Sequence, residues 1–124
     1  MVEFALIFIL LFTVITLIAE GGFLFGAWLA ATNGAREGAR FGAPCLNRTV
    51  APCYANPADG TPNVYNSVYQ YVSGFPGNFT VTVPPVPAGA TTVTVTVTAT
   101  VSSVAPILGD ITVSGQSTMR LENQ

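Results

Sequence analysis

The sequence predicts an α+β protein, in which a long N-terminal hydrophobic helix precedes a small C-terminal head with an antiparallel β-sheet of about three strands. Three observations support this prediction. Residues 4–31 form a nearly continuous apolar run without proline, residues 63–73 repeat apolar side chains at helical spacing, and three later segments alternate apolar and polar residues. We therefore divide the 124 residues into an N-terminal helix, 1–42, and a head, 43–124.

The N-terminal run is too long for a strand and is interrupted by a single charge. Between Phe4 and Ala19 the most polar side chains are Thr13 and Thr16, and beyond Glu20 the apolar character resumes. At about 1.5 Å per residue, a helix from Val2 to Phe41 is about 60 Å long, roughly twice the hydrocarbon thickness of a bilayer. Half of this helix must lie outside lipid.

Small residues recur at every fourth position in the outer half of this helix. They are Gly22, Gly26, Ala30, Gly34, Gly38 and Gly42. Positions four apart share one helix face and form a ridge that another backbone can approach closely. Each glycine costs about 1 kcal/mol of helix propensity relative to alanine, and close packing would recover that cost. The packing partner is either another copy of the chain or the protein's own head.

Two carboxylates lie at the two ends of the most apolar segment. Such a group costs about 2.5–3.5 kcal/mol at mid-membrane and less near an end, so each needs a partner. Glu3 is satisfied either by an N-terminal amine, its own or a neighbour's, or by the interface and the helix dipole. Glu20 either packs among helices, where it needs a hydroxyl, an arginine or a proton, or lies at the outer membrane face.

Arg36 and Arg40 lie in the last turns of the predicted helix, where cations complement the helix dipole. Glu37 precedes Arg40 by three residues, a spacing at which side chains on a helix meet. Two interpretations remain. Either this is a solvated helix end, or one of the arginines pairs with a carboxylate of the head or of another copy.

The composition excludes several classes of function. Charged residues make up 8% of the chain, and neither lysine nor histidine is present. The chain therefore has no basic face for nucleic acid and no imidazole for catalysis or metal binding. Serine and threonine are plentiful but have no histidine or lysine as a base, and the head has neither a spaced carboxylate pair nor a phosphate loop. We predict no enzyme activity and no catalytic, cofactor-binding or metal-binding residues.

Cys45 and Cys53 flank a proline-containing loop directly after the helix. In an exported head this arrangement predicts a short disulfide loop, and two free thiols are the alternative. A metal pair is disfavoured because the usual second pair of ligands is missing. The tripeptides that begin at Asn47 and Asn78 match the acceptor pattern for N-glycosylation, which is a weak signal.

The rest of the head is predicted to contain one short helix and three strands. The helix, within residues 63–73, presents an apolar face made of Val64, Val68, Tyr71 and Val72. The strands are residues 78–83, 91–101 and 111–121, and Gly115 marks an expected bulge in the last one. Valines form the core face of this sheet. The opposite face is rich in threonine and uncharged, so a neighbour, a glycan or water covers it.

Both ends of the chain resemble a known family. Residues 1–6 read Met-Val-Glu-Phe-Ala-Leu, a long apolar run follows, and residues 35–40 read Ala-Arg-Glu-Gly-Ala-Arg. This combination is similar to the TadE-like family, the pilin-type proteins of tight-adherence (Tad) pilus systems. Residues 111–122 also resemble the way such chains end. The middle of the chain is not diagnostic.

The resemblance implies a type IV pilin-like subunit that is inserted in the inner membrane. A prepilin peptidase trims such a subunit after a glycine, and the pilus assembly machinery draws it into an extracellular filament. The resemblance also implies that Glu3 neutralises a neighbour's N-terminal amine during assembly. Glu3 lies nearer the start than the family pattern has it, and no leader glycine precedes it. We therefore expect the printed chain to lack its leader and a couple of mature residues.

The sequence thus predicts a structural subunit whose helix forms a helical homopolymer with copies of itself at the cell surface. If the ridge of small residues guides this packing, Gly34→Leu or Gly38→Leu should block assembly without unfolding the head. One alternative is a minor pilin-like protein that primes or caps a pilus of another subunit. Another is a single-pass, membrane-tethered binding module outside the cytoplasm. None of these requires a cofactor or a nucleic-acid partner.

Overall fold

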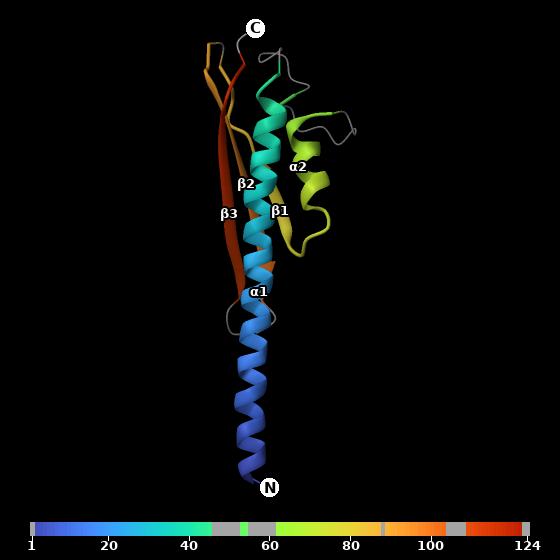
Figure 1. Ribbon diagram of the computed structural model, residues 1–124, viewed down its shortest axis with the longest axis vertical. Helices are drawn as coiled ribbons and strands as arrows, with labels where there is room; N and C mark the ends of the chain where they lie inside the picture. The colour runs from blue at the N-terminus through green and yellow to red at the C-terminus, as the bar shows by residue number, and fades with distance from the viewer. Residues whose placement is uncertain (1, 46–52, 55–61, 88, 104–108, 123–124) are drawn as a thin grey trace.

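The computed structural model describes residues 2–45, 53–54, 62–87, 89–103 and 109–122, and this part of the chain forms two helices and three strands. In chain order they are α1 (Val2–Gly42), α2 (Val64–Val72), β1 (Asn78–Thr82), β2 (Thr92–Ser102) and β3 (Asp110–Arg120). This order confirms the predicted α+β fold. Figure 1 shows an elongated molecule in which the N-terminal half of α1 projects from a head that contains the other elements.

α1 is one uninterrupted helix of 41 residues, about 60 Å long at 1.5 Å per residue. None of residues 3–19 is buried, whereas the C-terminal half of α1 lies along the sheet (Figure 1). Thr13 and Thr16 donate hydrogen bonds to the backbone carbonyls of Ile9, at 2.8 Å, and Phe12, at 2.9 Å. Both hydroxyls are therefore satisfied within the helix, as an apolar environment requires.

The three strands form one antiparallel sheet in the order β1-β2-β3. β2 pairs along its whole length with β3, from Thr92 opposite Arg120 to Ser102 opposite Asp110. Residues of β2 alternate between buried and less buried positions, which confirms the predicted core face of valines. The register gathers hydroxyl side chains of all three strands on the opposite face.

The core lies between the sheet, α1 and α2. The helix α1 contributes alanines that recur at every fourth position, and these form the side of α1 that faces the sheet. The sheet and α2 contribute mainly valines. Short side chains on α1 let the two layers approach closely, and β-branched side chains fill the narrow space between them. The buried residues of this core include Ala27, Ala31, Ala35 and Ala39 from α1, Val64, Val68 and Val72 from α2, and Val81, Val93, Val95, Val97, Ala99, Val101 and Leu121.

Gly115 does not mark a bulge. The pairing of β2 with β3 is continuous through Val97 opposite Gly115, so the predicted bulge is wrong. Gly115 instead lies against the backbone of Ala31 and Thr32 in α1, and a Cβ atom at position 115 would overlap both residues. Glycine is needed here because two backbones meet without a side chain between them.

α2 forms within the predicted segment. Asn63 caps its N-terminus, because the side-chain Oδ1 accepts a hydrogen bond from the Asn66 backbone nitrogen at 2.8 Å. The predicted burial of three valines is confirmed: these are Val64, Val68 and Val72. Tyr71 is less covered than the three valines. This side chain lies at the edge of the apolar face and is 42% exposed, and its ring stacks on Phe75 with centroids 6.4 Å apart.

Candidate assembly surface

The projecting half of α1 is an uncovered apolar surface. Its large side chains between Phe4 and Ile18 are 44–74% exposed. Phe4, Phe8 and Phe12 stack along one side of the helix, with neighbouring ring centroids 6.5 and 6.4 Å apart. Water-soluble monomers rarely expose an apolar surface of this extent. This half of α1 is therefore built to contact lipid or other protein.

By length and composition, α1 qualifies as a candidate membrane span over Glu3–Gly42, with a mean hydropathy of 2.5 in its most apolar window. A core helix of a soluble protein can also pass this test. In α1, however, only 6% of that window is buried inside the molecule. The apolar surface is thus not explained by the protein's own packing.

The outer part of the small-residue ridge is covered by the protein's own head. A Cβ atom at Gly38 would lie 2.6 Å from Val68 Cγ2 and 3.2 Å from Val95 Cγ1, and one at Gly34 would lie 3.0 Å from Val72 Cγ1. Gly42 is enclosed in the same way, and Ala30 is also buried. A leucine at position 34 or 38 would therefore meet side chains of the head, which argues against the expectation that the head stays folded in these variants.

The inner part of the ridge is open. An added Cβ atom at Gly22 or Gly26 meets no heavy atom within 4 Å, and the same holds for Gly21 beside them. Phe25 and Trp28 lie on the same stretch of helix and remain exposed, with ring centroids 5.9 Å apart. An uncovered surface with room for close approach therefore continues from the projecting half of α1 into the level of the head.

Glu20 is buried, with 6% of its surface exposed. The hydroxyl of Ser103, the residue after β2, donates a hydrogen bond to Glu20 Oε1. Among the described residues Oε2 has no hydrogen-bond partner. A hydroxyl, an arginine or a proton could satisfy this carboxylate. In the structure it is a hydroxyl, and it belongs to the protein's own head. Glu3 lies exposed near the opposite end of α1, and no described residue forms an ion pair with it.

The arginines lie on a solvated helix end. Arg40 Nε is 3.9 Å from Glu37 Oε2; the Arg40 side chain is largely exposed and the Glu37 side chain is partly exposed. An exposed pair of this kind contributes about 0–1 kcal/mol to stability. Arg36 is exposed as well. Within the described part of the chain, neither arginine pairs with a carboxylate of the head.

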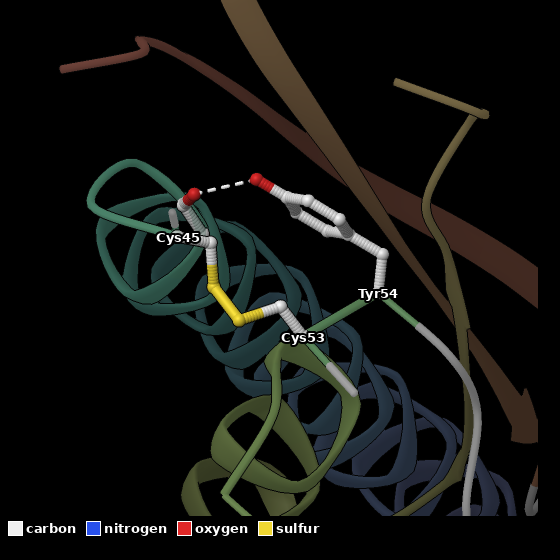
Figure 2. The surroundings of a disulfide bond; sticks show 4 residues. Cys45, Cys53 and Tyr54 are labelled. Carbon is white, nitrogen blue, oxygen red and sulfur yellow. Dashed lines mark hydrogen bonds between the residues drawn. A yellow bond between two sulfur atoms is a disulfide. The ribbon is translucent and has the colours of Figure 1, made fainter. Parts of the chain in front are cut away.

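The C-terminal end of α1 is tied to the loop that follows it. Cys45 and Cys53 form the predicted disulfide, with Cα atoms 6.4 Å apart. Tyr54 donates its hydroxyl to the backbone carbonyl of Gly42 at 2.6 Å, which satisfies one of the acceptors that a helix end leaves unpaired. Figure 2 shows the disulfide and the tyrosine ring side by side at this helix end.

Of the two asparagines that match the glycosylation pattern, one lies within the described residues. Asn78 is exposed at the first position of β1. Asn47 lies outside the described residues.

The described residues contain no group of three or more His, Cys, Asp or Glu side chains that could hold a metal ion.

Sequence reasoning missed two residues that complete this surface. Ser103 meets Glu20 across 83 positions, and Tyr54 meets Gly42 across 12. No local pattern identifies Ser103, because its role depends on where β2 ends relative to the helix. Tyr54 had a weak signal, since it follows a cysteine expected to be tied close to the helix end.

Together these features define a membrane-type helix that continues into a small α+β head. The family model described as TadE-like protein matches residues 1–40, which confirms the resemblance stated from the N-terminal motifs. The match covers 40 of the 124 residues, so the N-terminal membrane-type helix is the part of this chain that is similar to TadE-like proteins, and it suggests a Tad pilus-related, pilin-like protein. Comparisons with curated proteins and with solved structures give no match.

Proposed function

We propose that this protein is a structural subunit of an extracellular Tad-like filament and that it polymerises through α1. In this proposal residues 1–42 form the membrane and filament-core helix, and residues 43–124 form the exported head on the outside of the filament. The chain lies in the inner membrane before assembly. Its partners are other copies of the chain, membrane lipid, a prepilin peptidase and the pilus assembly machinery.

One observation carries the proposal: α1 has a large apolar surface that the molecule itself leaves uncovered. The exposed side chains extend from Phe4 to Leu29, about 39 Å at 1.5 Å per residue, which exceeds the roughly 30 Å of bilayer hydrocarbon. Lipid hydrocarbon alone does not account for this length. Packing among identical helices would cover all of it.

The open glycines indicate where such helices would approach most closely. Gly22 and Gly26 share one side of α1 and have free space beside them, so another backbone fits there without displacing the head. Gly34, Gly38 and Gly42 serve the contact between α1 and its own head instead. We therefore assign helix-to-helix contacts in the filament to the inner part of the ridge.

Glu3 has a separate role in the proposal. It is the acidic residue in the first turn of α1 and is exposed, with no ion pair to another described residue. In a bundle of helices this carboxylate would lose its water and would need a cation. The N-terminal amine of a neighbouring copy supplies one, in line with the role implied by the family resemblance.

Electron microscopy of material sheared from the cell surface, with mass spectrometry of its protein and N-terminus, tests this proposal. We expect filaments in which this chain is the major component. A chain that is rare in filaments built from another subunit would point to a minor, priming or capping protein. A chain that stays in the membrane fraction as a monomer would contradict the filament proposal and favour a membrane-tethered binding module.

A further inference from the structure

A stretch of α1 above Glu20 stays apolar and exposed at the level of the head. Phe23, Phe25, Trp28 and Leu29 are 42–62% exposed, although neighbouring residues on the other side of the helix are buried in the core. The rings of Phe25 and Trp28 contact each other, with centroids 5.9 Å apart. This aromatic surface lies beyond the length of helix that the hydrocarbon of a bilayer covers.

The surface is continuous with the membrane-type half of α1 because the one charge between them is hidden. Glu20 is the only charged residue of α1 between Glu3 and Arg36. Its carboxylate is buried in the molecule and accepts a hydrogen bond from Ser103. The head thus shields this carboxylate from whatever surrounds α1, and the uncovered surface from Phe4 to Leu29 carries no charge.

This uncharged surface is about as long as the hydrocarbon of a bilayer together with one headgroup layer. It is about 39 Å, against roughly 30 Å for the hydrocarbon and roughly 5–7 Å for each headgroup layer. Tryptophan and other aromatic side chains concentrate in the headgroup layers, where one ring has both apolar and polar neighbours. We propose that, in the membrane-inserted chain, the headgroup layer around the membrane-side end of the head covers Phe25 and Trp28.

The position of the sheet agrees with this depth. Gly115 lies against Thr32, and Asp110 is five residues nearer the membrane end, about 17 Å at 3.4 Å per residue. Glu20 is twelve residues below Thr32, about 18 Å along α1. Asp110 and Glu20 are therefore level. Because Asp110 is an exposed carboxylate, the end of the sheet stays in the hydrated headgroup layer and limits how deep the head sinks.

Trp28 is close enough to this boundary to reach the headgroup layer. Side chains on a helix point toward its N-terminus, so the indole lies nearer the membrane than its own Cα atom. Its contact with the Phe25 ring places the indole near the level of Phe25, about 7 Å above Glu20 along the helix. This inference rests on the membrane placement within the proposed function and does not depend on polymerisation.

Trp28 is the only tryptophan of the chain, so the unmodified protein carries its own fluorescent probe. The experiment reconstitutes the chain at high lipid excess in phosphatidylcholine vesicles. It measures quenching of the indole by lipids brominated near the headgroup or near the chain end, and by acrylamide in water. Two double variants calibrate the depth by moving the single tryptophan. Trp28→Phe with Phe12→Trp reports on the hydrocarbon, and Trp28→Phe with Tyr71→Trp reports on the head.

We expect Trp28 to be quenched more by bromine near the headgroup than by bromine near the chain end. Its exposure to acrylamide should fall between those of the two references. Acrylamide quenching equal to that of the Tyr71→Trp reference, with no quenching by lipid, would overturn the inference.

Trp28 could instead be protected from brominated lipid and from acrylamide, and lose this protection when more lipid is added. That result would mean that a second copy covers this surface. That result would also overturn the lipid inference while supporting helix-to-helix assembly. Absence of filaments in sheared material, combined with the expected quenching, would instead contradict the proposed function and leave the lipid contact standing.

Discussion

Gly115 of β3 lies directly against the backbone of Thr32 in α1, and this contact sets the height of the sheet along the helix. Towards the C-terminus from this point, α1 packs into the core of the head. Towards the N-terminus the sheet reaches only as far as Glu20, where Ser103 meets the carboxylate. The contact therefore determines how much of α1 stays uncovered for lipid or for other copies.

Replacing Gly115 by alanine should destabilise the head. The added methyl group has no space beside the α1 backbone, and overpacking of this kind costs about 1–3 kcal/mol. Thermal unfolding of the detergent-solubilised chain, followed by circular dichroism, measures the loss. Gly74→Ala is the matched control, because a Cβ atom there meets nothing within 4 Å. Equal melting temperatures for the two variants would show that the contact is not as close as described.

Gly26→Leu should block filament assembly and leave the head as stable as in the unchanged protein. An added Cβ atom at position 26 meets no other atom within 4 Å, and leucine is a better helix former than glycine. A defect in filament assembly would therefore not come from a clash within the molecule or from a weakened helix. Filament yield in sheared material and the melting temperature of the solubilised chain check both parts.

Gly21→Leu is the control for this prediction, because it makes the same chemical change off the ridge at an equally open position. We expect its filament yield to exceed that of Gly26→Leu. Equal filament yields from the two variants would show that the ridge does not guide assembly.

Gly38→Leu should instead unfold the head, since its side chain would displace Val68 and Val95.

Ser103→Ala should destabilise the head by about 1–3 kcal/mol, because it removes a hydrogen bond from a buried carboxylate. Replacing both partners, as Glu20→Met with Ser103→Ala, should restore most of this loss, since no buried charge then lacks its partner. Denaturant unfolding of the single and double variants gives the coupling energy. Purely additive effects would mean that the two side chains do not depend on each other.

Reducing the disulfide, or replacing Cys45 and Cys53 by serine, should lower the stability of the head by about 2–3 kcal/mol, as expected for a short closed loop.

Tyr54→Phe should have a smaller effect than loss of the disulfide, about 0.5–1.5 kcal/mol, through the lost hydrogen bond to the Gly42 carbonyl. Unfolding curves with and without reductant check both values. A larger loss from Tyr54→Phe than from reduction would reverse this order.

Periodicity predicted the elements well because each of them repeats one pattern. The alternating valines from Val93 to Val101 made β2 unmistakable, and the apolar run identified α1 before any contact was known. Strand ends differ from the predicted ones by about one residue. These elements depend on local burial, which the sequence itself encodes.

Tertiary partners were the part that the sequence did not reveal. Glycines at every fourth position indicate close packing but not what packs there. The sequence therefore left open whether another copy or the protein's own head covers Gly34 and Gly38, and the structure places Val68 and Val72 of α2 against them. Gly115 showed the same ambiguity, since a bulge and a close backbone approach leave one signature in a strand. Only the placement of the head along α1 separates these cases.

Thiol labelling in assembled filaments tests the central claim most directly, because the two native cysteines are paired. Cysteine in place of Phe12 reports on the projecting half of α1, and cysteine in place of Gln116 reports on the exposed outer face of the sheet. We predict that a water-soluble maleimide labels Gln116→Cys in intact filaments and labels Phe12→Cys only after the filaments are dissolved. Equal labelling of both thiols in intact filaments would contradict a filament core made of α1.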